Sequence, residues 1–487
     1  MGLTKTEGDM PMATMDTEPS KQKWMIVCFI LATGLVLFYN LWARNLENHG
    51  YLRYAEIARE MIRSGDWVVP HHNGEIYVDK PPLIFWLIAI PSWFYGSVTP
   101  LTARLPSALS AWAGVVVLFL WGKRVYGAVK TGIISGGLCL MSFQYFFEGR
   151  NSKADMLLCF TIILSLYLFY LGYDTERGKS YLFYGLSFFS MGLGALTKGP
   201  FGIAIPILIM IAFLLKERQT KILVSREFFI GYVVLAFTVL PWIILFLKNV
   251  GWQQTIALVQ SNRVLTRKAP VYFYFYKIWV EFFPLSLAIP FLFSHLWRKG
   301  GERRQPGESF LLIWFVLLLI LLTLFTFRAS RYLLPAMPPL ALLTGGLIRK
   351  RFPYFVAVFC LFVVIWHGVD WHRIRTNLSR SPGMVLVGEL RPVLGGAPLS
   401  GYKLDVSTLE ELNFYLDRVT IILKEAGHLA GNRFILMPEK AYRALLASGC
   451  DSLHLLREFP YKGERLFLTS TMDCPGSSGP VGRNTDA

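Results

Sequence analysis

Residues 24–42 read WMIVCFILATGLVLFYNLW, and residues 47–86 read ENHGYLRYAEIAREMIRSGDWVVPHHNGEIYVDKPPLIFW. The first segment is apolar and long enough to cross a bilayer as a helix. The second combines acids, bases and histidines with aromatic residues, which is typical of a structured loop on a membrane face. A connection that only returned the chain to the membrane would need far fewer residues. We therefore expect the chemistry of this protein in the loop at residues 44–100.

Apolar runs recur along the chain, which has 487 residues, 54% of them apolar and 17% charged. Soluble domains carry about 25% charged residues. The runs predict an α-helical polytopic membrane protein, and residues 83–97, shorter and interrupted by proline, predict an interfacial helix. The first run is too long for the apolar core of a signal peptide, so we expect a membrane helix behind a disordered cytoplasmic tail, residues 1–23. The eleven expected spans are 24–43, 101–121, 131–147, 155–173, 181–197, 201–215, 228–247, 276–297, 309–327, 332–348 and 353–370.

The formal net charge of +17 comes from Lys and Arg clusters in every second connection between the apolar runs. This distribution is the one that the positive-inside rule gives cytoplasmic loops. It predicts a cytoplasmic N-terminus and an outer face that carries the remaining polar residues. The charge therefore indicates membrane topology and contact with membrane lipids, and it argues against a nucleic-acid partner.

Residues 371–474 have a soluble composition and predict a small periplasmic α/β domain after the membrane domain at 24–370. We expect strands at 384–387, 398–403 and 434–437, and helical segments at 408–416, 419–430 and 439–448. Cys450 and Cys474 could form a disulfide in an extracytoplasmic domain. A disordered tail is expected at 475–487.

Several polar residues of the outer face are candidates for chemistry. Residues 53–61, RYAEIAREM, have helical spacing that places Arg53, Glu56 and Glu60 near one face; intrahelical ion pairs would explain them equally well. The rigid turn from Asp79 to Pro82 presents Lys80, which could contact a phosphate or extend toward the headgroups.

Asp155 lies at the outer end of an expected membrane helix, where a carboxylate is costly and is a functional candidate. A salt bridge to Arg150 or Lys153 is the plain alternative. Lys198 lies in a Lys-Gly-Pro turn between two helices and places a second cation on the same face.

These motifs occur in an order that resembles one family. They are RYAEIAREM (53–61), GDW (65–67), KPP (80–82), ARLPS (103–107), Asp155, LTKGP (196–200) and RYLLP (331–335). The chain is similar to the bacterial polyprenyl-phosphate-dependent glycosyltransferases of the GT-C fold, which include relatives of protein O-mannosyltransferases and the lipid A aminoarabinose transferase. The resemblance covers about residues 24–350.

The resemblance implies a sugar donor carried on a polyprenyl phosphate. It assigns the donor phosphate to Lys80, Lys198 and Arg331, and an outer-face carboxylate to Asp155. The residues expected to shape the cavity or contact substrate are Arg53, Tyr54, Glu56, Asp79, Arg150 and Tyr332.

Two departures from the family pattern bear on mechanism. Where the family carries an Asp-Glu pair, thought to act in catalysis, this chain has Gly50 and Tyr51, so Glu47, His49 and Asp155 remain alternative bases. Some members have a metal-binding histidine in the loop at 248–276, where this chain has arginine and lysine. We therefore predict no metal site there, and the sequence requires no cofactor, although a divalent metal is compatible with the reaction.

The expected activity is transfer of a sugar, with inversion, to lipid A, another glycolipid, a polysaccharide or a protein at the periplasmic face of a bacterial inner membrane. A transporter or flippase of lipid-linked sugars is one alternative, but such proteins place polar residues near the membrane midplane. A relative that binds the donor without turnover is the other.

Overall fold

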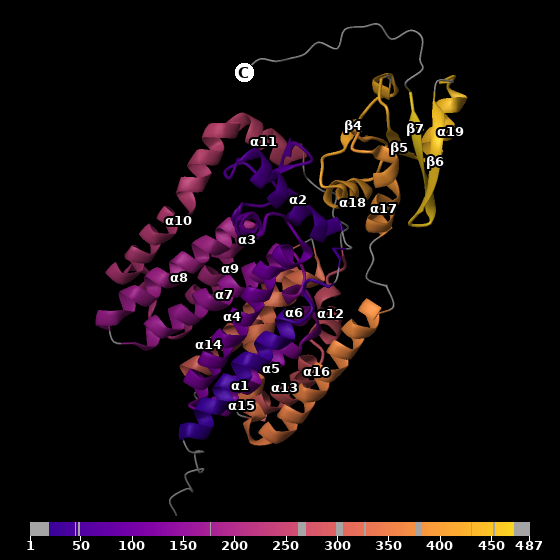
Figure 1. The fold of residues 1–487 in the computed structure, drawn as a ribbon. Coiled ribbons are helices and arrows are strands. Elements are labelled where there is room, and N and C mark those ends of the chain that lie inside the picture. The colour runs from indigo at the N-terminus through magenta and orange to yellow at the C-terminus, as the bar shows by residue number, and fades with distance from the viewer. Residues whose placement is uncertain are drawn as a thin grey trace, which may run out of the picture.

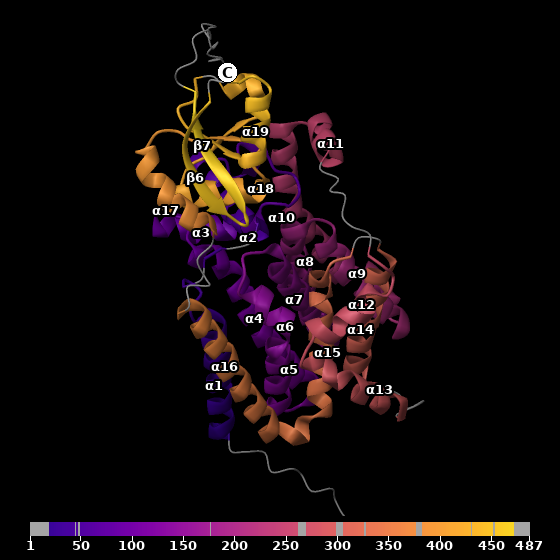
Figure 2. The same ribbon diagram turned by 90° about the vertical axis from the view of Figure 1, so that its right-hand side faces the viewer.

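The computed structural model describes residues 19–43, 45–46, 49–175, 177–261, 269–298, 305–325, 328–375, 382–429, 431–450 and 453–471. These residues form a helical bundle with a small sheet-containing domain at one end (Figures 1 and 2). Helices α2 (His49–Ser64) and α3 (Leu83–Tyr95) lie between the bundle and this domain.

The long helices have the composition of membrane spans. Six described helices are long and apolar enough to cross a membrane: α1 (Pro19–Phe38), α4 (Pro100–Tyr126), α7 (Ala154–Asp174), α10 (Arg226–Val250), α14 (Pro306–Leu324) and α16 (Phe352–Arg375). A bent pair, α12 (Phe273–Glu281) and α13 (Ile289–Arg298), gives a seventh if it is one span. The protein is therefore a multi-pass helical membrane protein, as expected.

The expected count of eleven spans is not confirmed, although described helices overlap all eleven segments. The remaining helical elements of the bundle are α5 (Val129–Met141), α6 (Phe143–Gly149), α8 (Arg177–Lys198), α9 (Phe201–Lys216), η1 (Thr220–Val224), α11 (Trp252–Ser261), η2 (Leu285–Ala288), η3 (Ser330–Ala336), α15 (Met337–Leu347) and η4 (Arg349–Arg351).

Two expected helices are broken, and the two breaks meet. Ser142 is extended and separates α5 from α6. Between α12 and α13 the chain passes through Pro284 and bends by 110°; a proline lacks the N–H that continues a helix. The Phe143 N–H donates to the Phe283 carbonyl at 2.9 Å. Apolar composition alone does not reveal breaks that are stabilised by such tertiary contacts.

Aromatic packing joins the helices of the bundle. Trp121 of α4 and Trp314 of α14 are fully buried and stack with ring centroids 5.6 Å apart. Phe169 of α7 and Phe310 of α14 stack at 5.9 Å. Such pairs add stabilisation beyond the burial of apolar area, so these contacts fix α4, α7 and α14 relative to one another.

The loop at residues 44–100, which the charge pattern predicts on the outer face and which we call the first outer loop, contains helices and a hairpin in its described part. The expected helix at 53–61 lies within α2, and the expected interfacial helix is α3. Between them β1 (His71–His72) and β2 (Glu75–Ile76) form a hairpin. Asn73 and Gly74, with φ of 56° and 78°, make the two-residue turn for which an Asn-Gly sequence is favourable.

The C-terminal domain contains a five-stranded sheet of order β4-β3-β5-β7-β6. Strand β3 is parallel to β4 and β5, whereas β7 is antiparallel to β5 and β6. Its elements are α17 (Pro382–Leu394), β3 (Ser400–Tyr402), α18 (Val406–Leu416), β4 (Ile421–Leu423), η5 (Ala426–Leu429), β5 (Ile435–Pro438), α19 (Glu439–Ala447), β6 (His454–Tyr461) and β7 (Glu464–Ser470).

The α/β character of this domain is confirmed, but two local predictions were wrong. Residues 384–387 belong to α17, because Leu386, Leu390 and Leu394 recur at helical spacing and are all buried. The segment 419–430 contains β4 and η5 instead of one helix. Strands β6 and β7 were not expected. Cys474 lies outside the described residues, as does the expected tail, so a disulfide with Cys450 stays a prediction.

Candidate functional site

An ion pair at the ends of two neighbouring helices forms the centre of the candidate site. Asp155 lies in the first turn of α7 and is 6% exposed. Lys198 is the last residue of α8, and its Nζ lies 2.5 Å from Asp155 Oδ1. Of the expected alternatives for Asp155, neither Arg150 nor Lys153 makes this contact. The partner comes from the next helix along the chain.

The local sequence around Lys198 explains its position. Gly194 of α8 and Gly202 of α9 touch, and a Cβ on Gly202 would lie 2.1 Å from the Gly194 carbonyl carbon. Gly199 has φ of +67°, a conformation that glycine adopts without strain. The Lys-Gly-Pro turn therefore packs two helices closely and leaves the lysine at the turn, beside Asp155.

A second cation reaches Asp155 from η3. Arg331 Nε lies 3.8 Å from Asp155 Oδ1, and the Arg331 side chain is 43% exposed. Tyr332 lies beneath both cations: its ring centroid is 4.8 Å from Lys198 Nζ and 5.4 Å from Arg331 Cζ. An aromatic face stabilises nearby cations. Tyr332 therefore helps to keep two positive charges together.

Lys80 brings a third cation from the first outer loop. Its Nζ donates to the Asp79 carbonyl at 2.9 Å. Burial lowers the pKa of Lys80, and the positive charge of Lys198 lowers it further. Lys198 and Arg331 thus contact Asp155, and Lys80 lies close enough to interact electrostatically with all three. We name Lys80, Asp155, Lys198 and Arg331 the cation cluster.

Glu148, at the end of α6, is the functional candidate that sequence reasoning missed. It is 6% exposed, and its Oε2 has no hydrogen-bond partner among the described residues. Burial raises the pKa of Glu148 to about 7, with the charge of Asp155 adding to the rise, while Lys153, Arg331 and Lys198 oppose it. Its place just before Arg150 was visible in the sequence, but its proximity to the cluster was not.

The residues at the position of the missing acids take part in packing. Gly50 and Tyr51 lie in α2, and Tyr51 is buried. Lys153 Nζ lies 4.5 Å from the Tyr51 ring centroid. An aromatic face thus contacts Lys153 at the position where the family carries acids. Glu47 lies outside the described residues, and the His49 side chain also lies outside them.

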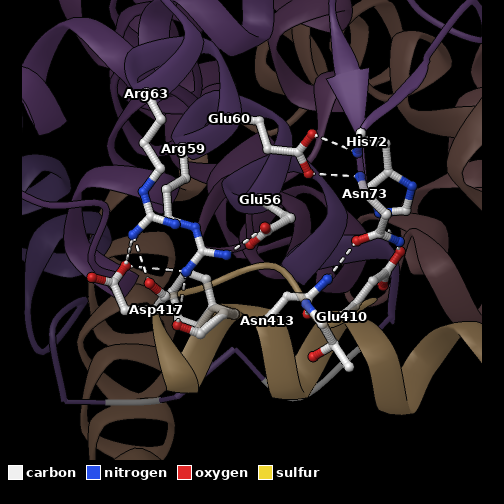
Figure 3. Close-up of polar contacts among 12 residues, drawn as sticks. Glu56, Arg59, Glu60, Arg63, His72, Asn73, Glu410, Asn413 and Asp417 are labelled. Atoms are coloured by element: carbon white, nitrogen blue, oxygen red, sulfur yellow. Dashed lines mark hydrogen bonds and ion pairs between the residues drawn. The ribbon is translucent and has the colours of Figure 1, made fainter. Parts of the chain in front are cut away.

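Two expected substrate residues have other contacts. Arg150 is 1% exposed, pairs with Asp370 of α16 at 2.8 Å and donates to the Tyr39 carbonyl at 2.6 Å. Glu56 is fully buried and pairs with Arg59, facing α18 of the C-terminal domain (Figure 3). These contacts indicate a structural role for Arg150 and Glu56. For Glu56, the contact is the intrahelical ion pair that the sequence offered as the alternative to a substrate contact.

Tyr54 and Arg53 lie between the cluster and the C-terminal domain. Tyr54 is buried against Phe85, with ring centroids 5.6 Å apart. Burial raises the pKa of Tyr54 well above its usual value, with smaller effects from Tyr77 and Asp155. Arg53 Nε lies 3.1 Å from Glu410 Oε1 of α18.

No group of three or more metal-ligating side chains occurs among the residues that the structure describes. The loop residues Arg267 and Lys268, which motivated the prediction of no metal there, lie outside the described residues. That prediction is therefore untested.

The central part of the chain matches a known family. Residues 79–245 match the model of the dolichyl-phosphate-mannose-protein mannosyltransferase family. The matched region begins beside Lys80 and includes Asp155 and Lys198.

Solved structures decide the fold. The structure of ArnT from Cupriavidus metallidurans bound to undecaprenyl phosphate aligns with a TM-score of 0.74, at 20% identity, over 93% of this chain and 98% of that chain. An oligosaccharyltransferase from Archaeoglobus fulgidus aligns with a TM-score of 0.56, at 12% identity, over 93% and 74%. The chain has the GT-C fold. The resemblance expected from the ordered motifs is confirmed.

Sequence relatives of this GT-C chain agree with the structural match. An undecaprenyl phosphate-alpha-4-amino-4-deoxy-L-arabinose arabinosyl transferase from Pseudomonas fluorescens is 29% identical over 68% of this chain and 58% of the relative. An uncharacterized protein from Aquifex aeolicus is 28% identical over 68% and 64%. This GT-C chain thus spans about three fifths of the length of the curated relatives it matches.

Proposed function

We propose that the protein transfers a sugar from an undecaprenyl-phosphate-type donor to an acceptor hydroxyl or phosphate. The observation that carries this proposal is the convergence of Lys80, Lys198 and Arg331 around one carboxylate, Asp155. An excess of positive charge at an outer-face helix end is the environment that an anionic lipid phosphate requires. The names of the curated relatives support an undecaprenyl-phosphate-linked sugar as the donor.

The cation cluster would act on the leaving group. An acceptor oxygen attacks the anomeric carbon, the bond from that carbon to the phosphate oxygen breaks, and polyprenyl phosphate leaves with the bonding electrons. Direct attack inverts the anomeric configuration. Lys80, Lys198 and Arg331 would stabilise the negative charge that grows on the phosphate, and such preorganised charge is usually the largest catalytic term.

The proton of the acceptor hydroxyl needs a base. Asp155 was one expected base, but Lys198 and Arg331 engage its Oδ1, and a carboxylate held by two cations accepts a proton poorly. Glu148 has a free buried oxygen and a pKa near neutrality. We therefore assign the proton to Glu148 and give Asp155 the role of holding Lys198 and Arg331. Glu47 and His49 stay alternatives from the sequence.

The proposed location is a bacterial inner membrane, with the N-terminus cytoplasmic and the C-terminal domain periplasmic. Basic clusters in alternate connections support this orientation. A cysteine at Glu75, whose side chain is 76% exposed on the same hairpin, should then react with an impermeant thiol reagent in spheroplasts. Protection until lysis would reverse the orientation.

A transfer assay tests the proposed function. The purified protein should release the sugar of a labelled undecaprenyl-phosphate donor to an acceptor panel that includes lipid A. Arg331→Gln should lower kcat/KM by about 10–100-fold, because a charge-assisted contact to the phosphate is lost. Arg457→Gln, a matched change on the exposed surface of the C-terminal domain, should keep wild-type activity.

Two results would count against this proposal. Equal rates of transfer by wild type and Arg331→Gln would show that Arg331 takes no part in the mechanism. Donor binding without transfer to any acceptor would favour the non-catalytic relative that Gly50 and Tyr51 suggest.

A further inference from the structure

The C-terminal domain contacts the first outer loop through a polar interface between α18 and α2 (Figure 3). At one end of the interface, Asp417 accepts hydrogen bonds from Arg59 at 3.1 Å and Arg63 at 2.8 Å. In the middle, the Asn413 amide donates to the Asn73 Oδ1 at 2.7 Å. These contacts fix the domain on α2 and on the β1–β2 turn.

Glu410, one turn before Asn413 on α18, makes a different kind of contact. Its side chain is fully buried, and its Oε1 lies 3.1 Å from Arg53 Nε and 3.2 Å from His72 Nε2. A buried carboxylate is unfavourable unless its partners compensate for lost water. Arg53 and His72 both belong to the first outer loop, so the C-terminal domain supplies a carboxylate to these loop residues.

Arg53 extends this contact toward the cation cluster. Arg53 also lies beside the Tyr77 hydroxyl: burial raises the pKa of Tyr77 to about 12, and the neighbouring Arg53 opposes this rise. The Tyr77 ring contacts His72 and Phe85, with centroids 6.2 Å and 5.9 Å away. Arg53 and His72 therefore both lie beside Tyr77.

Tyr77 lies at the start of the short segment that carries Lys80. Its N–H donates to the Pro70 carbonyl at 2.8 Å, which ties this segment to the β1 side of the hairpin. Two residues, Val78 and Asp79, separate Tyr77 from Lys80. Pro81 and Pro82 restrict the chain immediately beyond the lysine. Displacement of Tyr77 would thus move the lysine.

We propose that Glu410 is a positioning residue of the donor site: through Arg53 and His72 it holds Tyr77, and through Tyr77 it sets the place of Lys80. The C-terminal domain is then a part of the donor site, although none of its residues belongs to the cation cluster. This inference rests on the proposed function, since it assigns Lys80 to the donor phosphate.

The test compares two changes in the same interface. Glu410→Gln removes the charge that Arg53 and His72 share. Asp417→Asn removes the charge that Arg59 and Arg63 share, and it leaves Arg53 and Tyr77 untouched. Both variants lose ion pairs at this interface, but Glu410 is buried and Asp417 is 67% exposed. A merely structural role for Glu410 therefore predicts a larger loss of stability in Glu410→Gln, without a change in lipid affinity per folded molecule.

Binding of undecaprenyl phosphate alone is measured by calorimetry in detergent, beside donor KM and kcat in transfer. Glu410→Gln should weaken lipid binding and raise donor KM by about 10–100-fold, because small displacements of a binding group have effects of this size. Asp417→Asn should change either constant by less than about fivefold, as expected for a partly exposed ion pair. Glu410→Asp should recover part of the loss.

A second variant covers the case in which Glu410→Gln does not fold. Tyr77→Phe removes only the hydroxyl that Arg53 engages, and the account predicts the same selective rise in donor KM. Equal effects of Glu410→Gln and Asp417→Asn, or unchanged lipid binding in Glu410→Gln and Tyr77→Phe, would overturn the inference.

The two proposals fail separately. If wild type binds undecaprenyl phosphate in a Glu410-dependent way but transfers no sugar, the positioning role stands and the transfer proposal fails. If transfer occurs and is insensitive to Glu410 and Tyr77, the positioning role fails alone. Absence of lipid binding in wild type would overturn both.

Discussion

Two buried carboxylate–cation pairs near helix ends behave differently in this molecule. Arg150 and Asp370 form a closed pair: their side chains are 2% and 4% exposed, and Arg150 also donates to a backbone carbonyl. Asp155 and Lys198 form an open pair, because Arg331, 43% exposed, approaches the same carboxylate oxygen and Lys80 adds a third positive charge.

The difference separates a structural contact from a binding site. The closed pair of Arg150 and Asp370 is buried and joins α16 to the bundle. In the cation cluster, Lys80, Lys198 and Arg331 come together beside Asp155, and the Arg331 side chain is 43% exposed. An accessible group of cations favours an anionic ligand. Burial alone would have assigned both pairs the same role.

The largest effect is expected at Glu148, which tests whether the open site performs acid–base chemistry. Glu148→Gln should lower kcat by about 10²–10⁴-fold, the usual contribution of a general base, and should leave lipid binding in place. Transfer assays and calorimetry on the same preparation measure this. The control Glu389→Gln changes a half-exposed surface carboxylate, and wild-type kcat in Glu148→Gln would return the base to Glu47, His49 or Asp155.

Arg150→Ala tests the closed pair. It should lower the free energy of unfolding by about 3–5 kcal/mol, because it removes one member of a buried ion pair. Lipid affinity per folded molecule should stay the same. Thermal unfolding in detergent measures the change, with Arg124→Ala, which breaks the exposed pair with Asp174, as a control expected to cost about 0–1 kcal/mol. A loss of lipid affinity with normal stability would place Arg150 in the donor site.

The pH dependence of the transfer rate is a smaller effect, and it is specific to the titration of Glu148. Because burial raises the pKa of Glu148 to about 7, the group is protonated below that pH and cannot accept the acceptor's proton. The rate should fall about tenfold per pH unit below 7 and level off above it. This fall in rate below pH 7 should disappear in Glu148→Gln. A decrease in rate that begins only near the ordinary glutamate pKa, or one that persists in the variant, would exclude Glu148 as the base.

The sequence predicted the GT-C fold, because ordered motifs carry the residues that a shared fold brings together. Lys80, Asp155, Lys198 and Arg331 do lie near one another, while their role in donor binding stays a prediction. The sequence did not predict which cation pairs with Asp155, since that depends on how α7 and α8 pack. The role of Glu148 was missed for the same reason.

Local ambiguities also have physical causes. Residues 384–387 are apolar enough for a strand, and only the burial of Leu386, Leu390 and Leu394 reveals α17. Helical spacing correctly placed Glu56 on a polar face of α2. The sequence could not show that α18 covers this face, because a surface created by another domain leaves no local pattern.

The affinity of Lys80→Ala for undecaprenyl phosphate tests the central claim most directly. The lysine makes a backbone contact to Asp79 and no ion pair in the described structure, so its removal should leave the fold unchanged. The account predicts binding weaker by about 10–100-fold than in wild type, with the same unfolding temperature. Equal affinity in the two proteins would contradict the assignment of the cation cluster to the donor phosphate.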